Sequence, residues 1–385
     1  MYPEQDRLVR KEVALGTIRE MEPPLTHIGT AMLAPFMEVA TDDVIFDYAK
    51  GLTDGLAPAR AEDAEAELAQ KDLLFGGTGR AAVLDWSLKD HYSASDVTRY
   101  RESLMVQSRL GTNIPLPLTV GSMVEEFRAK IARDDALRRR KLDNRLEWMI
   151  LQAMETGGIA YNDGKIKFAV DYGRPSGQQD QAPIALWSST TSDPIKDILN
   201  MQEFMYDTYG VRMTRAITSK KVLDNTLNSD KFIARAGLAV GGYSIPSGGT
   251  VGNPGTTLDP NYLIDGWGAD AARAVIERQT GVRFEVYDSV YRTRPVGSKV
   301  ITNNRFFSQN KILFLPDPSD LAELDDMIGF GRTLTSPHPE GNWQPGFYEW
   351  EEETKDPWGL NRGTGIKAFP VFPHLDLTFT MTVLA

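Results

Sequence analysis

Apolar residues recur at three- and four-residue steps over one long stretch of the chain, from Thr119 to Glu155. The members of this apolar face are Val124, Phe127, Ile131, Leu137, Leu142, Leu146, Met149, Ile150 and Ala153. The spacing predicts one amphipathic helix of about 35 residues, roughly 50 Å long. Gly157 and Gly158 follow it and are typical of a helix C-terminus. A helix of this length exceeds what an ordinary small domain needs.

Alternation of apolar and polar residues predicts strands on both sides of this helix. The segment Lys165–Gly173 follows the helix and alternates over its length. Earlier in the chain, two strand-like segments, Val44–Tyr48 and Ala81–Leu88, bracket an acidic, alanine-rich insert, Ala59–Gln70. Because this insert has no core of its own, we expect a long projecting hairpin.

The two ends of the chain carry different patterns. Pro23, Pro24 and Pro35 interrupt the first segment and predict an extended arm rather than a long helix. Between Asp193 and Pro316, helical and strand patterns alternate as in a compact α/β module. The terminal segment Phe369–Ala385 reads as a strand again. We expect this last strand to close the sheet that contains the earliest strands.

Composition narrows the classes of protein that the chain can belong to. With 385 residues and 41% hydrophobic content, it is long enough for two or three domains. It has no cysteine, which excludes disulfides, thiolate metal sites and cysteine nucleophiles. The net charge of -11 argues against sequence-specific nucleic-acid binding. Neither a signal peptide nor a membrane-spanning run is visible, so we interpret the protein as soluble and cytoplasmic, with no membrane partner.

Motifs for catalysis are weak. The segment Gly76–Ala81, GGTGRA, precedes a strand and lacks the Lys-Ser/Thr of a phosphate-binding loop, so we interpret it as a hairpin turn. The glycine-rich segment Gly237–Asp259 is interpreted as a flexible surface loop. The histidines do not stand at metal-ligand spacings: they are His27, His91, His338 and His374. We expect no catalytic residues, no cofactor and no metal.

The acidic residues Glu349 and Glu351–Glu353 admit two interpretations. A pair of carboxylates is what a glycoside hydrolase would use. Positions on alternating sides of a strand favour a solvated, charged face instead.

One basic cluster stands out, and it lies within the long helix. Its members are Arg138, Arg139, Arg140 and Lys141. Pairing within the helix, with acids such as Asp134 and Asp135, is the simplest interpretation. The alternatives are an inward patch that meets packaged polyanion or a contact with a neighbouring subunit.

Two segments resemble the family called phage major capsid protein E. The first is EWMILQAMETGGIAYNDGKIKFAVDYGRP, in which a helix ends in a small-residue turn before a strand that ends Asp-Tyr-Gly-Arg. The second is the C-terminal run GFYEWEEETKDPWGLNRGTGIKAFPVFPHLDLTFTMTVLA, with an aromatic strand, an Asp-Pro turn and a final strand.

The resemblance implies an α+β chain with the Hong Kong 97 type fold of tailed-phage major capsid proteins. The expected parts are an N-terminal arm (1–35), an E-loop hairpin (36–93), a peripheral domain with the long spine helix (94–192), an inserted α/β axial domain (193–325) and C-terminal strands that return to the peripheral domain (326–385).

The implied function is structural. The protein is expected to self-assemble, as hexamers and pentamers, into an icosahedral head shell around double-stranded phage DNA, which it contacts without sequence preference. Scaffold, portal and decoration proteins are the implied partners, and assembly in the host cytoplasm is expected to give the virion. Two alternatives stay open at this point: an encapsulin-type nanocompartment shell protein, and an α/β enzyme acting on carbohydrate or nucleotide.

Overall fold

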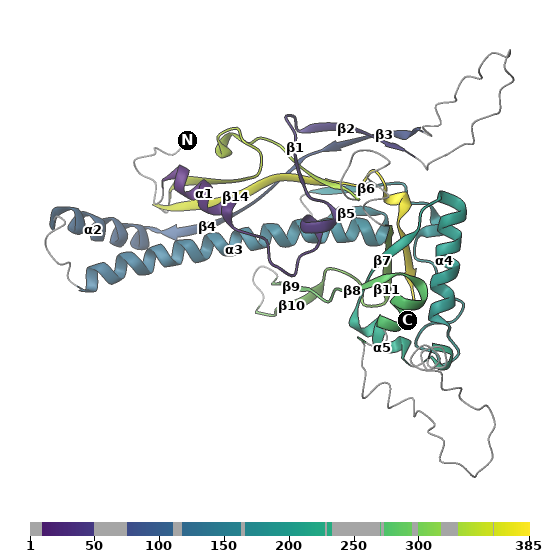
Figure 1. Cartoon of the computed structure of the whole chain (residues 1–385). Helices are drawn as coiled ribbons and strands as arrows, with labels where there is room; N and C mark the ends of the chain where they lie inside the picture. The colour runs from purple at the N-terminus through teal and green to yellow at the C-terminus, as the bar shows by residue number, and fades with distance from the viewer. Residues whose placement is uncertain are drawn as a thin grey trace, which may run out of the picture. The chain divides into compact units, whose positions relative to one another are not determined.

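A computed structural model describes residues 10–49, 75–110, 118–162, 166–227, 229–232, 270, 273–294, 299–316, 330–356 and 358–385 (Figure 1). The chain divides into two compact units. The first contains residues 1–46, 80–148 and 332–371, and the second contains residues 47–79, 149–331 and 372–385. The insert Ala59–Gln70 and the loop Gly237–Asp259 lie outside the described residues, so the expectations for them stay predictions.

The first unit is built on a five-stranded sheet with the order β1-β12-β14-β13 and with β4 also paired to β14. The strands are β1 (Phe36–Glu38), β4 (Leu84–Ser93), β12 (Arg332–Thr335), β13 (Phe347–Lys355) and β14 (Trp358–Val371). The long central strand β14 runs antiparallel to β13, β4 and β12. Segments from both ends of the chain therefore share one sheet.

Two glycines of β14 let aromatic rings of β13 pack over its backbone. A Cβ atom at Gly363 would lie 2.3 Å from the ring of Trp350, and one at Gly365 would lie 2.4 Å from the ring of Tyr348. These distances are far shorter than any van der Waals contact, so a side chain at either position would displace a ring. The glycines are thus a packing requirement of this sheet.

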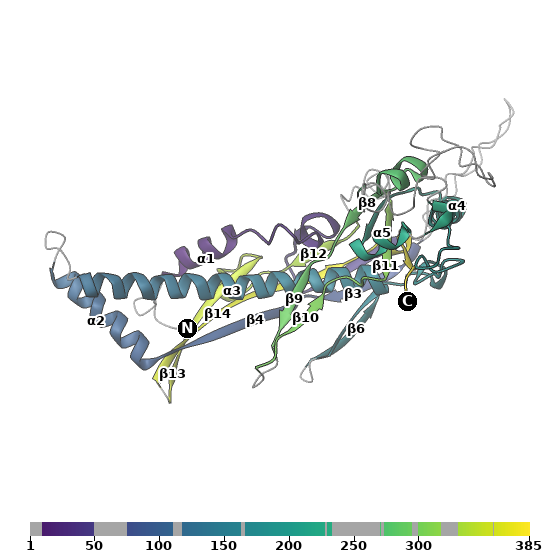
Figure 2. The same cartoon turned by 90° about the horizontal axis from the view of Figure 1, so that it is seen from below.

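Helices accompany the sheet of the first unit. They are α1 (Lys11–Glu20), α2 (Ala94–Leu110) and α3 (Leu118–Thr156), which has 39 residues and whose last turns belong to the second unit. The predicted long helix is therefore confirmed within one residue at each end. Figure 2 shows α3 running along β4 and β14. Tyr92, Val97, Ile131 and Leu360 form an apolar cluster between these elements.

The prediction of an extended N-terminal arm was wrong for the segment that precedes the prolines. Helix α1 buries Ala14, Leu15 and Ile18, so tertiary packing stabilises a helix that Pro23 limits in length but does not forbid. A short π-helical turn, η2 (Gly29–Leu33), follows.

The second unit has an α/β core. Its four-stranded sheet has the order β15-β11-β7-β8, with β7 (Met213–Thr218), β8 (Arg283–Val286), β11 (Lys311–Pro316) and β15 (Phe379–Thr382). Helices α4 (Pro194–Tyr209) and α5 (Lys220–Thr226) contribute to the apolar core. Asp193 caps α4 by accepting from the Lys196 backbone N–H at 3.2 Å, and Gly210 ends it with φ 69°. The predicted alternation of helices and strands is present here.

The prediction that the terminal strand closes the first sheet was wrong. Strand β15 pairs antiparallel with β11, in the sheet of the second unit. The chain leaves the first sheet at the end of β14 and turns through the 3-10 helix η5 (Leu375–Leu377). It then buries Phe379 and Met381 in the α/β core. Burial of these apolar side chains explains why β15 pairs with β11. The C-terminal strand that returns to the first sheet is β14.

Three pairs of strands form separate ribbons. They are β2 (Asp43–Ala49) with β3 (Phe75–Ala82), β5 (Gly158–Asn162) with β6 (Lys167–Asp171), and β9 (Val290–Thr293) with β10 (Thr302–Arg305). The segment Gly76–Ala81, predicted to be a turn, lies inside β3, because the hairpin extends further than the apolar pattern indicated. Within the described residues, no helix is long and apolar enough to cross a membrane, and no group of three or more acidic or histidine side chains could hold a metal ion.

Candidate functional site: the charged faces of the long helix

Helix α3 separates its charges between its two faces. In its described part between residues 127 and 148, Asp135, Asp143 and Glu147 are buried, while Asp134 is partly buried and accepts from the Tyr92 hydroxyl at 3.0 Å. The exposed charged residues over the same stretch are all basic: Arg128, Lys130, Arg133, Arg140 and Lys141. Between residues 127 and 148 the helix therefore turns its acids inward and its bases outward, whereas Glu125 and Glu126, just before this stretch, are exposed. The whole chain carries a net charge of -11.

Arg138 points into the first unit and ties α3 to two strands. Its guanidinium donates to Thr364 Oγ1 on β14 at 3.0 Å and to Asp90 Oδ2 on β4 at 2.5 Å. It also pairs with Asp135, one turn earlier on the helix. Only 1% of Arg138 is exposed, so these contacts replace its hydration.

Arg362 on β14 is the second cation of this network. It forms a two-pronged contact with Asp135, at 3.1 Å and 3.0 Å, and donates to Glu351 Oε1 at 2.5 Å. It also forms an ion pair with Glu349. Because Glu351 faces Arg362 directly across β13 and β14, the sheet register itself sets this pairing. The surrounding carboxylates raise the pKa of Arg362 above its ordinary value.

The network has four carboxylates, Asp90, Asp135, Glu349 and Glu351, and two guanidinium groups. Burial raises the pKa of Glu349 to about 8, against the attraction of Arg362 and with further repulsion from Asp135 and Glu351. In the described structure neither oxygen of Glu349 accepts a hydrogen bond, although one lies against Arg362. Burial and the neighbouring carboxylates therefore favour the protonated form of Glu349, and the charge of Arg362 opposes this shift.

Arg139 is buried in a different place on the same helix. Its Nε atom lies 3.0 Å and 3.1 Å from the two carboxylate oxygens of Asp143, and another nitrogen donates to the Ile18 carbonyl of α1 at 2.7 Å. The guanidinium also stacks 3.3 Å from the ring centre of Phe347 on β13. Burial raises the pKa of Asp143, and the charge of Arg139 opposes that rise. This pair fastens α1 and β13 to the long helix.

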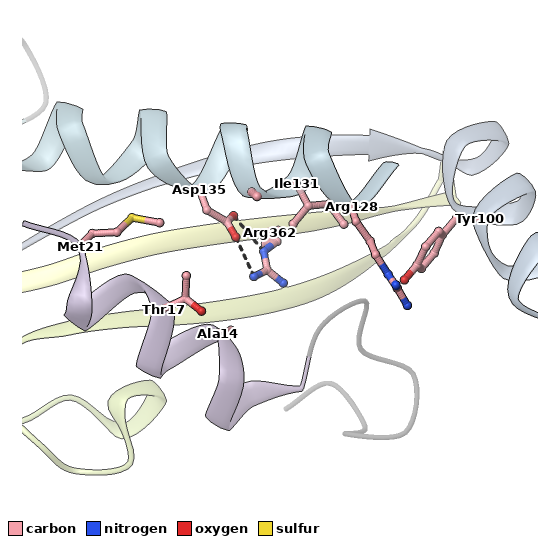
Figure 3. Close-up of a pocket in the computed structure, with 9 residues that line it drawn as sticks. Ala14, Thr17, Met21, Tyr100, Arg128, Ile131, Asp135 and Arg362 are labelled. Atoms are coloured by element: carbon pink, nitrogen blue, oxygen red, sulfur yellow. Dashed lines mark hydrogen bonds and ion pairs between the residues drawn. The ribbon is translucent and has the colours of Figure 1, made fainter. Parts of the chain in front are cut away.

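A pocket of about 320 Å³ lies beside the buried network in the first unit (Figure 3). Ala14, Thr17 and Met21 of α1 line one side, and residues of α3, including Ile131, line the other. The Asp135–Arg362 ion pair closes part of its wall, and Tyr100 and Arg128 lie toward one end. Most of the lining surface is apolar, and the charged groups that line it are Arg128, Asp135 and Arg362.

In the second unit, a buried arginine forms hydrogen bonds at the end of α3. Arg174 donates to the Met154 carbonyl at 2.7 Å and to Thr378 Oγ1 at 2.6 Å. It therefore satisfies a carbonyl of the last helical turn and holds the C-terminal segment against it. Burial lowers the pKa of Arg174 to about 10, and Asp180 opposes this shift.

The structure divides the basic cluster predicted from sequence. Arg138 and Arg139 are buried and paired within the helix, with Asp135 and Asp143. Arg140 and Lys141 are exposed. The division follows from the helical period, because consecutive residues point in directions about 100° apart.

The expectation of a solvated face on β13 was also wrong in part. Glu349 and Glu351 are buried, whereas Glu352 and Glu353 are exposed. The sequence analysis did not identify Arg362, which makes burial of these acids possible. The one available signal was an isolated arginine in the strand-like run GLNRGTGIKAF.

Comparison with known proteins identifies the architecture. The model of the family described as phage major capsid protein E matches residues 15–383. The chain belongs to this family. A protein of E. coli CFT073, assigned as a prophage capsid protein, is 14% identical, covers 97% of each chain and has a TM-score of 0.55. A phage-related protein of Bordetella bronchiseptica RB50 is 15% identical over 96% of each chain, with a TM-score of 0.47.

A third solved structure, the capsid of Myoviridae phage XM1, is 11% identical and covers 95% of this chain and 94% of its own, with a TM-score of 0.43. No curated protein matches the chain. Family membership and the fold show that this is a structural protein of a phage capsid shell, with the Hong Kong 97 type fold of tailed-phage major capsid proteins. The charged network of the capsid protein is therefore part of a shell subunit.

Proposed function

We propose that this capsid protein assembles, as hexamers and pentamers of itself, into an icosahedral head shell that encloses double-stranded phage DNA. The observation that carries the proposal is the family match over residues 15–383. Scaffold, portal and decoration proteins are the proposed partners, and the host cytoplasm is the proposed place of assembly. The expected E-loop, peripheral and axial domains belong to the same proposal.

The role that we propose is structural rather than catalytic. Three buried acids, Asp135, Glu349 and Glu351, lie together in the first unit. These acids are held against Arg362 rather than presented to a substrate. A carboxylate-pair enzyme needs both groups on an open cleft with room for a sugar between them. Buried ion pairs of this kind fix the alignment of elements instead.

The exposed basic face of α3 is the proposed DNA contact. Arg133, Arg140 and Lys141 are exposed on the helix, while its acids in the same region are turned inward. Such a face lowers the repulsion between an acidic shell and packaged DNA. The contact would be to phosphates alone, without base recognition, because the shell must accept any sequence of the genome.

The test removes charge from this face and leaves the buried pairs intact. The double variant Arg140→Gln/Lys141→Gln should assemble into shells of normal size that hold less DNA after nuclease treatment. Lys220→Gln/Lys221→Gln is the matched control, since both residues are exposed neighbours at the start of α5 in the second unit. Electron microscopy gives the shell size, and extraction of the protected nucleic acid gives its amount.

Equal DNA content in the variant, the control and the unmodified shells would contradict the DNA contact. Failure of the double variant to form any shell, with the control assembling, would assign the two residues to a subunit interface instead. Unmodified shells that hold protein cargo and no DNA would contradict the phage head and favour an encapsulin-type compartment.

A further inference from the structure

Trp343 is an exposed aromatic residue held in an unfavourable backbone conformation. Its side chain belongs to the loop between β12 and β13, and 72% of the residue is exposed. Asn342 and Trp343 have φ angles of 58° and 56°. Two successive non-glycine residues in the left-handed region are uncommon, and a bulky ring makes the second more so. Strain of this kind persists where surrounding contacts enforce it.

Those contacts are present on both sides of Trp343. Arg19 of α1 donates to the carbonyls of Gly341 and Phe347, each at 3.1 Å, and to Gln344 Oε1 at 2.5 Å. The Trp343 backbone N–H donates to the His338 carbonyl at 3.1 Å. The loop is therefore fixed in place, and it holds an indole ring in solvent. A large exposed aromatic on a rigid support is typical of an interaction anchor.

The pocket of the first unit offers a complementary surface. Its volume of about 320 Å³ lies at the lower end of the range of roughly 300–1,000 Å³ for small-molecule sites. Its apolar walls suit a single aromatic side chain. Arg128 lines the pocket, and it forms an exposed ion pair of 3.5 Å with Glu125. A guanidinium in this position complements the electron-rich face of an indole ring, and Tyr100 adds a second ring.

The pocket and Trp343 use different faces of α1. Ala14 and Thr17 lie on one side of α1 and line the pocket together with Met21, which directly follows the helix, as Figure 3 shows. Arg19, which holds the Trp343 loop, lies on roughly the opposite side at 3.6 residues per turn. A projection and a matching recess on different faces of one unit cannot satisfy each other within a subunit. They suit a head-to-tail contact between copies, which closes into a ring or a shell.

We propose that Trp343 of each subunit inserts into the α1–α3 pocket of a neighbouring copy of this chain. The inference rests on the proposed shell function, because it requires an assembly of identical subunits. It adds a specific anchor and its socket. Burial of one indole ring, with a cation against its face, makes this contact a centre of the interface rather than a part of its rim.

Photochemical crosslinking tests the contact directly. Trp343→p-benzoylphenylalanine keeps an aromatic ring at the loop, and its photoexcited ketone inserts into a nearby C–H bond. Shells assembled from a mixture of ¹⁵N-labelled and unlabelled subunits distinguish links between copies from links within one. The expected product joins residue 343 of one copy to the region of Thr17–Met21 or Arg128–Ala132 of another. Leu25→p-benzoylphenylalanine is the control, because Leu25 is 98% exposed and does not line the pocket.

A link from residue 343 only to other regions of a neighbour, or only within its own subunit, would overturn the proposal. The proposal would also be overturned if, in assembled shells, the pocket were occupied by the chain's own first nine residues or by a small molecule. Wild-type protein that forms no shell would contradict the proposed function itself. That outcome is read by electron microscopy before any crosslink is sought.

Assembly measurements provide a second, independent test. Trp343→Ala should raise the subunit concentration needed for assembly by about tenfold or more, the effect of losing an interface anchor. Ala132→Trp, which places a ring at the exposed edge of the pocket, should have a similar effect. The two changes combined should add little, since both remove one contact. Leu25→Ala should leave assembly unchanged, and additive effects of Trp343→Ala and Ala132→Trp would contradict the proposal.

Discussion

The two units of this capsid protein are stabilised by different interiors. The second unit has an apolar core in which side chains such as Trp187, Phe284 and Phe314 are almost fully buried. The first unit encloses a network of charges, with Arg138 and Arg362 each 1% exposed. Apolar burial is non-directional and depends little on pH, whereas ion pairs require one alignment and respond to protonation. The first unit therefore has a more strictly defined geometry and a stability that depends on pH.

The largest effect is expected from Arg362→Met, which breaks the network of the first unit. Asp135, Glu349 and Glu351 would lose their shared cation, and removal of one partner of a buried pair costs about 3–5 kcal/mol. Hydrogen exchange should show faster opening of β13 and β14, more so at pH 9 than at pH 5. Amides of β11 in the second unit are the internal control. Unchanged protection of β13 and β14 would contradict the role assigned to Arg362.

Phe314→Ala provides the corresponding test for the second unit. Phe314 is fully buried between Phe284 and Phe379, and its truncation leaves a cavity that costs about 3–5 kcal/mol. The loss of stability should appear as faster hydrogen exchange at β7 and β11. The free-energy change should be the same at pH 5 and pH 9. A strong pH dependence here would remove the contrast between the two interiors.

Glu349→Gln should sharpen the comparison by removing the pH dependence of the first unit. The pKa of Glu349 is raised from 4.5 to about 8, so between these values the folded unit keeps a proton that the unfolded chain loses. The folded state binds more protons, and its stability falls as pH rises through this window, by at most about 1.4 kcal/mol per pH unit. The variant should be nearly neutral at pH 4.5 and more stable than the unmodified protein at pH 8.

The change of stability with pH is measured by chemical denaturation at several pH values, with hydrogen exchange at β13 as the local probe. Glu352→Gln is the matched control on the same strand, because Glu352 is exposed. If both variants keep the slope of the unmodified protein, Glu349 is not its source.

A smaller effect is expected from Gly365→Ala, which crowds the first sheet without changing a charge. The added methyl group would meet the Tyr348 ring at 2.4 Å, and overpacking of this kind costs about 1–3 kcal/mol. Gly16→Ala is the control, since nothing lies within 4 Å of its added methyl group in α1. It should be neutral or stabilising by up to about 1 kcal/mol. Thermal unfolding of both variants compares their midpoint temperatures. Equal midpoints would contradict the packing role assigned to Gly365.

Local pattern was sufficient to predict the elements whose stability is mostly local. The long helix was expected at Thr119–Glu155 and extends over Leu118–Thr156, because its apolar period continues through both ends. Helix α4 could be predicted for the same reason, with Asp193 and Gly210 as its limits. Helix α1 could not, because its stability comes from packing onto β13 and the long helix, which are distant in the sequence.

The charged network depends on contacts that no local pattern contains. Asp135 and Arg362 are 227 positions apart, and their meeting depends on how α3 packs against β14. The register between β13 and β14 places Glu351 opposite Arg362. Glu349 and Glu351 share one face of β13, while Glu352 faces the other way, and alternation alone does not say which face is covered. For the basic cluster, the sequence offered only the helical period of α3. Once one buried position is known, this period places Arg138 and Arg139 on the buried face and Arg140 and Lys141 on the exposed face.

Cryo-electron microscopy of the assembled protein tests the central claim most directly. The account predicts closed shells of uniform size, with the exposed face of Arg140 and Lys141 toward the interior and the Arg138–Asp135–Arg362 network enclosed within each subunit. A protein that stays a monodisperse monomer under all assembly conditions and turns over small substrates would contradict it.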